Sequence, residues 1–286
     1  MRDHDGARGR TPEPAASAAL GLVAGWDVPD PAVAVLDRRG EVHRRGDTAR
    51  VSRVASVTKL LTAWAVLVAA EEGSVSLDDP VGQPGCTLRH LLAHAGGYSF
   101  EGAEPFVAPG TKRVYSNTGY DLAAAHVAAA TGMAFDEYLD EAVCAPLGMA
   151  DTGLDGSPAR DVWSSVDDLV RFAAELRRPT LVSRATWLDA RSPQWPELEG
   201  VVPGVGRFDP CPWGLGPELK GAKSPHWLGD RCSAGTAGHF GGTGSFLWHD
   251  PVADVAAVAL CDREFGPWAL PDWPTFCDAL VAGARA

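Results

Sequence analysis

The chain has 286 residues, which is long enough for one large domain with a buried core. Hydrophobic residues make up 45% of the sequence and charged residues 22%, a balance typical of globular proteins. The formal net charge of −12 argues against binding to nucleic acid or to an anionic membrane, because both need a basic surface.

The N-terminal residues 1–12 are expected to form a disordered tail. The apolar stretch Ala15–Trp26 follows, and it is too short to span a membrane. Asp3, Asp5 and Glu13 precede it and no convincing cleavage site comes after it, so we interpret it as a helix rather than a secretion signal.

Six cysteines are widely spaced along the chain and include no CxxC pair. Without a secretion signal such cysteines are usually reduced and buried, so neither a disulfide nor a zinc cluster is favoured. We therefore expect free thiols, no cofactor and a cytoplasmic protein.

A strand, a tight turn and a second strand are predicted at Ala32–Leu36, residues 37–40 and Glu41–Arg45. Residues 57–72 are apolar on nearly every side, which predicts a helix buried at the centre of the protein. Ser56 stands at the N-terminal end of this helix, where a capping serine is common.

The middle of the chain is predominantly helical and its last third is not. Helical patterns occur at residues 88–95, 120–131, 135–143 and 166–177. Strands are predicted at 213–219, 243–249 and 255–261, and a closing helix at 273–284. Strands at both ends with helices between them predict an α+β fold whose sheet joins the two termini.

Ser56-Val57-Thr58-Lys59 is the first candidate for catalysis. A serine hydroxyl is a poor nucleophile until a base takes its proton, and a lysine one helical turn later faces the same side. Burial lowers the pKa of a lysine so that it can act as a neutral base. The pattern alone is weak, since a capping serine followed by a solvated lysine would look the same.

Tyr115-Ser116-Asn117 is the second candidate. Asn117 is the only asparagine in the chain, and it lies beside one of four tyrosines. Glycine, aspartate or serine serves in the other turns, so this asparagine indicates a specific amide contact, with a turn residue as the alternative. A tyrosine can act as a general base if a cationic neighbour lowers its pKa.

Two further segments contain residue types found in active sites. The glycine-rich segment 238–244 contains His239, Gly241 and Gly242 and enters a predicted strand, where glycines indicate a bulge or a close approach. His90 and His94 have the i, i+4 spacing of a metal-binding pair. The glutamate of the HExxH pattern is absent, so capping or core histidines are favoured over a metal site.

Ser56-x-x-Lys59, Tyr115-x-Asn117 and His239-x-Gly241 resemble, in this order, the three motifs of the penicillin-recognising serine hydrolases. These comprise the serine β-lactamases, the D,D-peptidases and related esterases, and the likeness is closest to the class C branch with its family VIII esterases. It extends over roughly residues 20–280.

The resemblance implies a five-stranded antiparallel sheet flanked by helices, with a mainly helical lobe inserted into it. The chain would then form a single domain at 13–286, with an α/β lobe at 13–57 and 180–286 and a helical lobe at 58–179.

The resemblance also implies roles for the motif residues. Ser56 would attack a carbonyl to form an acyl-enzyme, and Lys59 and Tyr115 would share the proton transfers. Asn117 would hold Lys59 or the substrate amide. The backbone N–H groups of Ser56 and Gly242 would form the oxyanion hole.

His239 stands where the lactamases and transpeptidases usually have a lysine that binds the substrate carboxylate. A neutral imidazole attracts a carboxylate poorly, which favours a small uncharged ester as the substrate. The substrate is expected to be a small molecule or a short peptide. A D-alanyl-D-alanine carboxypeptidase, a β-lactamase and a catalytically silent binding or sensor module remain as alternatives.

Overall fold

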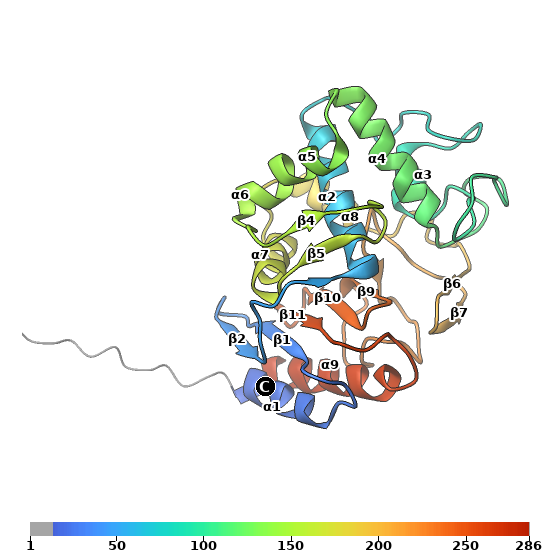
Figure 1. Cartoon of the computed structure of the whole chain (residues 1–286). Helices are drawn as coiled ribbons and strands as arrows, with labels where there is room; N and C mark the ends of the chain where they lie inside the picture. The colour runs from blue at the N-terminus through green and yellow to red at the C-terminus, as the bar shows by residue number, and fades with distance from the viewer. Residues whose placement is uncertain (1–13, 286) are drawn as a thin grey trace, which may run out of the picture.

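The computed structural model describes residues 14–285, and the predicted tail at 1–12 lies outside them (Figure 1). Its main element is a six-stranded antiparallel sheet in the order β2-β1-β11-β10-β9-β8. The strands are β1 Ala32–Leu36, β2 Val42–Arg45, β8 Glu218–Leu219, β9 Ala237–Gly241, β10 Ser245–Asp250 and β11 Val255–Leu260. The N-terminal and C-terminal segments therefore share one sheet, as predicted.

The sheet has one strand more than the five that the resemblance implied, and the extra strand is the short edge strand β8. The predicted strand at 213–219 is wrong over most of its length. Trp213 pairs with Glu218 across a tight turn that contains Gly216 at φ +107°, a conformation that glycine adopts readily and that cannot continue a strand.

The two faces of the sheet are buried in different hydrophobic clusters. In β1, Val33 and Val35 point into one cluster and Ala34 and Leu36 into the other, as the two-residue period of a strand requires. Helices α1 Pro14–Leu22 and α9 Ala269–Arg285 lie side by side on the first face (Figure 1). Helix α7 Val166–Arg177 packs against β1, β10 and β11 on the other face.

The remaining helices form the part of the molecule drawn above the sheet in Figure 1. They are α2 Thr58–Glu71, α3 Leu88–Leu92, α4 Asn117–Thr131, α5 Phe135–Leu139, a π-helical turn η3 Asp140–Cys144, α6 Ala145–Leu147 and α8 Arg184–Ala190. The division into two lobes stays a prediction, although α7, which it placed with the helical lobe, packs on the sheet.

Short strands that the sequence pattern did not predict join the larger elements. They are β3 Ser52–Arg53, β4 Gly153–Leu154 and β5 Val162–Ser164 in one small sheet, and β6 Gly200–Val202 with β7 Gly206–Phe208 in a hairpin. Two 3-10 turns, η1 Val23–Gly25 and η2 Ala55–Val57, precede β1 and α2.

Helix α2 positions the candidate site because it runs through the centre of the molecule. Its residues from Thr58 to Ala69 are all buried, and it contacts α4, α5 and β9. Its N-terminal end therefore lies between the sheet and the helical region, and a side chain there can meet groups from both.

All six cysteines are buried and free, as predicted. None of the helices at residues 14–285 combines the length and the apolar character that crossing a bilayer requires.

Candidate active site

Ser56 lies in the η2 turn that leads into α2, directly after Ala55, which has φ +45°. The capping interpretation of Ser56 is wrong. The cap residue of α2 is Val57, and no side chain caps this helix end. The half-buried Ser56 hydroxyl instead lies at the wall of a cavity of about 260 Å³.

Gly241 allows β9 to approach the segment before Ser56. A Cβ at Gly241 would lie 2.4 Å from the Val54 carbonyl oxygen and 2.3 Å from Ser245 Oγ, so no larger residue fits. Ser245 Oγ donates a hydrogen bond to that same carbonyl at 2.7 Å. Gly241 thus acts through packing, whereas Gly242 lines the cavity and has open space around it.

Lys59 is fully buried, and its partners are uncharged. Its Nζ donates to Asn117 Oδ1 at 2.6 Å, to the Ala159 carbonyl oxygen at 2.9 Å and to Ser56 Oγ at 3.4 Å. Burial lowers the pKa of Lys59 to about 7, against the attraction of more distant carboxylates. Near neutral pH a large fraction of the molecules therefore carries a neutral amine beside the Ser56 hydroxyl.

Tyr115 lies next to this pair. Its ring centroid is 4.7 Å from Lys59 Nζ, and its hydroxyl interacts with Ser56. Burial raises the pKa of Tyr115, and the hydrogen bond with Ser56 opposes this only in part. The hypothesis that a cationic neighbour lowers the Tyr115 pKa is therefore wrong. Of the two groups, Lys59 is the one that can accept a proton near neutral pH.

His239 extends from β9 toward the Tyr115 hydroxyl. Its Nδ1 lies 2.6 Å from the Phe240 carbonyl oxygen, so we assign the ring proton to Nδ1. Nε2 is then an acceptor, 3.4 Å from the Tyr115 hydroxyl oxygen. Burial, reinforced by the charge of Lys59, lowers the pKa of His239 to about 3. The imidazole is neutral in the range where the enzyme would work, as the sequence analysis expected.

His90 and His94 have structural contacts that explain their spacing. His90 completes a capping box with Thr87 at the start of α3 and stacks on Trp195 at 4.2 Å between ring centroids. His94 accepts a hydrogen bond from the Ser116 N–H at Nδ1. Within residues 14–285, the one group of three potential metal ligands is Asp37, Glu41 and His43, which includes neither.

The cavity beside Ser56 is apolar. Aromatic side chains form much of its wall, and no charged side chain lines it. The aromatic residues are Phe100, Tyr115, Trp213, Phe240 and Phe265. Only Tyr115 among them was proposed as a site residue from the sequence: Phe240 lies in the candidate segment 238–244 but was given no role, and the other three lie in separate loops.

The sequence is similar to proteins of one family. The family model described as Beta-lactamase matches residues 21–276. The crystal structure of a β-lactamase from Mycobacterium bovis is 48% identical, with a TM-score of 0.92, and the match covers 94% of this chain and all of that one. Unliganded simvastatin synthase from Aspergillus terreus has the same fold at 20% identity, with a TM-score of 0.78 over 96% of this chain and 100% of its own.

A curated relative, the D-alanyl-D-alanine-carboxypeptidase/endopeptidase AmpH from Escherichia coli, is 29% identical over 145 residues. That match covers 38% of each chain, so this sequence spans less than two fifths of the relative's length.

Proposed function

Because the chain belongs to the β-lactamase family, we propose that it is a serine hydrolase that forms an acyl-enzyme on Ser56 and hydrolyses a small uncharged carboxylic ester. One observation carries the proposal. Lys59, whose pKa burial lowers to about 7, lies 3.4 Å from the Ser56 hydroxyl at the wall of a cavity without charged side chains.

In the proposed acylation step, the neutral Lys59 amine accepts the Ser56 proton while Ser56 Oγ attacks the ester carbonyl carbon. The backbone N–H groups of Ser56 and Gly242 would stabilise the oxyanion. The proton then passes from Lys59, through the Tyr115 hydroxyl, to the departing alcohol oxygen. A water molecule attacks the acyl-enzyme, the same groups remove its proton, and Ser56 regains its hydrogen when the acid leaves.

In this scheme His239 orients Tyr115 rather than binding a carboxylate. Because Nδ1 donates to the Phe240 carbonyl, Nε2 can accept the Tyr115 hydroxyl hydrogen. The phenol oxygen then keeps a lone pair with which it can take the proton from Lys59, while Tyr115 passes its own hydrogen to the departing alcohol. A protonated Tyr115 between Ser56 and His239 is consistent with its raised pKa.

The cavity supports an apolar substrate. Its volume of about 260 Å³ suits a short or medium acyl group. An adjoining cavity of about 470 Å³ shares Phe100, Tyr115 and Pro203 with it. Phe106 and Val201 line that second space and are exposed, so the alcohol part of an apolar ester would find apolar contacts there. Lys112 and Arg113 line it too, but Lys112 pairs with Glu199, and the Arg113 guanidinium is bonded to backbone carbonyl oxygens.

The second candidate is a β-lactamase or D-alanyl-D-alanine carboxypeptidase, which the descriptions of two relatives favour. Both kinds of substrate carry a carboxylate. Since the side chains lining the cavity beside Ser56 supply no cation and His239 is neutral, this cavity would bind that carboxylate weakly. The ester is therefore the first choice.

A comparison of p-nitrophenyl acetate, butyrate and octanoate with nitrocefin and a D-alanyl-D-alanine peptide tests the proposal. We expect the acetate and butyrate esters to be hydrolysed fastest, and Ser56→Ala to abolish turnover. Nitrocefin hydrolysis at the ester rate would contradict the substrate class. Penicillin acylation without any turnover would instead indicate a binding module, and an unaffected Ser56→Ala variant would exclude Ser56 as nucleophile.

A further inference from the structure

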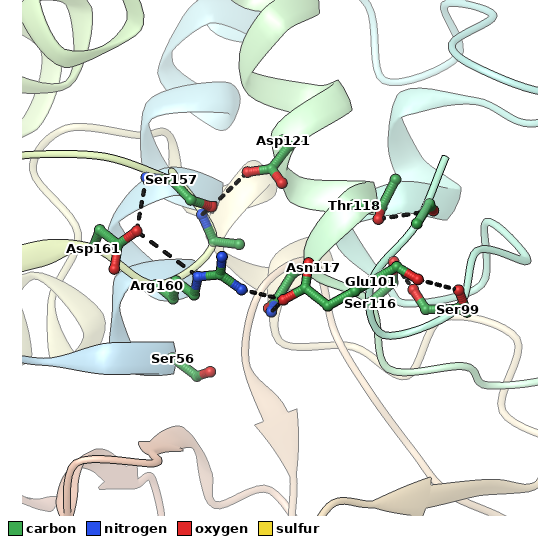
Figure 2. A network of polar contacts seen from close by, with 12 residues as sticks. Ser56, Ser99, Glu101, Ser116, Asn117, Thr118, Asp121, Ser157, Arg160 and Asp161 are labelled. Carbon is green, nitrogen blue, oxygen red and sulfur yellow. Dashed lines mark hydrogen bonds and ion pairs between the residues drawn. The ribbon is translucent and has the colours of Figure 1, made fainter. Parts of the chain in front are cut away.

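The Asn117 side chain is hydrogen-bonded to both Lys59 and Glu101. Glu101, which lies beside Asn117 in Figure 2, is an acidic residue that no sequence motif singled out. Asn117 Oδ1 accepts from Lys59 Nζ at 2.6 Å, and Asn117 Nδ2 donates to Glu101 Oε1 at 2.8 Å. An ionised carboxylate can only accept hydrogen bonds. Glu101 therefore selects the orientation of the amide in which the oxygen, and not the NH₂ group, faces the Lys59 amine.

The loop that carries Glu101 is fixed by the start of α4. The Asn117 N–H donates to the carbonyl of residue 100 at 2.9 Å. Ser116 Oγ donates to the carbonyl of residue 99 at 2.8 Å, and Thr118 Oγ1 to that of residue 102 at 3.1 Å (Figure 2). The cap residue Ser116 and the first two residues of α4 thus hold the loop, and the half-exposed Glu101 side chain is held further by its bonds to Asn117 and Arg160.

Arg160 forms an ion pair with Glu101 from the opposite side. Its neighbour Ala159 supplies the carbonyl that accepts from Lys59, and its other neighbour, Asp161, pairs with Arg53 at 3.1 Å. Arg53 lies in β3, three residues before Ser56. The Glu101–Arg160 pair, drawn in Figure 2, therefore joins the two loops that flank Lys59.

We propose that Glu101 and Arg160 are positioning residues for the hydrolase: they close the two loops over Asn117 and hold Lys59 in place to exchange a proton with Ser56. The inference rests on the proposed function, because it assigns these residues a role in the same catalytic step. Neither Glu101 nor Arg160 lines the cavity beside Ser56, so we do not assign them a substrate-binding role.

The opposite charges of the pair act in opposite directions on Lys59. Burial has the largest effect on its pKa, which Asp121 and Glu101 raise and Arg160 lowers. The other titratable groups facing Lys59 are the tyrosines Tyr115 and Tyr120 and the buried histidines His94 and His239. Loss of the Glu101 charge should therefore lower the pKa of Lys59, and loss of the Arg160 charge should raise it.

The pH dependence of Ser56 labelling by a fluorophosphonate tests this inference without knowledge of the substrate. We expect the midpoint of the rate to move to lower pH in Glu101→Gln and to higher pH in Arg160→Gln, each by about half a unit. Both variants should also label about tenfold more slowly at the plateau, because Asn117 loses its support. Midpoints that stay at the wild-type value, or that move in the same direction, would overturn the proposal.

Glu104→Gln is the matched control. Glu104 is an exposed glutamate of the same loop, and its substitution by glutamine removes the same negative charge. It should keep the wild-type midpoint and plateau. Arg160→Lys keeps the positive charge and should restore the wild-type midpoint. Should Arg160→Gln fail to fold, Glu101→Gln and Arg160→Lys carry the test. Absence of Ser56 labelling in the wild type would refute the proposed function itself, whereas labelling with unshifted midpoints would refute the positioning role alone.

Discussion

Lys59 and Lys223 are both buried, yet their surroundings differ in one respect. Lys59 Nζ donates to an amide, a carbonyl and a hydroxyl oxygen. Lys223 Nζ donates to the carboxylate of the equally buried Glu218 at 2.5 Å. The same carboxylate accepts from His226 Nε2 at 2.8 Å and from Trp227 Nε1 at 2.7 Å. The Lys59 amine is thus surrounded by neutral acceptors, whereas the charge of the Lys223 ammonium is compensated by the Glu218 carboxylate.

The difference explains why only one cluster suits proton transfer. Burial would raise the pKa of Glu218, but Lys223 and His226 outweigh it and hold that pKa well below its usual range. A carboxylate in direct contact stabilises an ammonium in the same way. Around Lys59, Asp121 and Glu101 act only from beyond its direct contacts, so burial decides its pKa. We therefore expect the proposed chemistry of Ser56 to depend on keeping a carboxylate out of direct contact with Lys59.

The largest effect is expected from Lys59→Arg, which makes the charge at this position permanent. A guanidinium cannot be deprotonated in a protein, so Ser56 would lose its base. We expect kcat/KM for p-nitrophenyl butyrate to fall by about 10²–10⁴-fold, the usual range for a positioned general base. The half-exposed Lys112, which pairs with Glu199 and lines the second cavity, provides the matched control Lys112→Arg: the charge is kept and no base is lost, so kcat should stay at the wild-type value even if KM changes. Activity within about threefold of wild type in Lys59→Arg would show that Lys59 is not the base.

A smaller effect, on stability rather than on activity, is expected from Glu218→Gln. This change leaves the buried Lys223 ammonium without a counter-charge, and breaking a buried pair in this way costs about 3 kcal/mol. Denaturant unfolding should show the loss. The double variant Glu218→Gln/Lys223→Met should regain much of it, because neither charge then remains. If the free energy of unfolding of Glu218→Gln fell by less than about 1 kcal/mol, Lys223 would not depend on Glu218 as a counter-charge, and the contrast with Lys59 would not hold.

Elements and contacts could be predicted from the sequence where a regular hydrophobic period or an ordered set of motifs indicates them. Helices α2, α7 and α9 and strands β1, β10 and β11 were predicted close to their observed bounds, because burial of one face or of the whole element leaves a regular apolar pattern. The ordered motifs, through the resemblance, also brought together Ser56, Lys59, Tyr115 and Asn117, and these side chains do contact one another in the structure. Their catalytic roles stay a prediction.

Other features depend on contacts that no local pattern encodes. Glu101 and Arg160 lie in exposed loops, where charged residues are common, and only the folded chain brings them together. Strand β8 is two residues long and follows a turn of glycine and proline, so its apolar residues predicted a longer strand than exists. The raised pKa of Tyr115 follows from its burial among distant segments, which the sequence could not show.

The rate at which a fluorophosphonate labels Ser56 between pH 5 and 9, with the modified residue identified by peptide mass, tests the central claim most directly. If neutral Lys59 activates Ser56, the rate should rise with pH, because the amine must lose its proton, and should reach half its maximum near the Lys59 pKa of about 7. A rate that does not change across this range, or a label on a residue other than Ser56, would contradict the account.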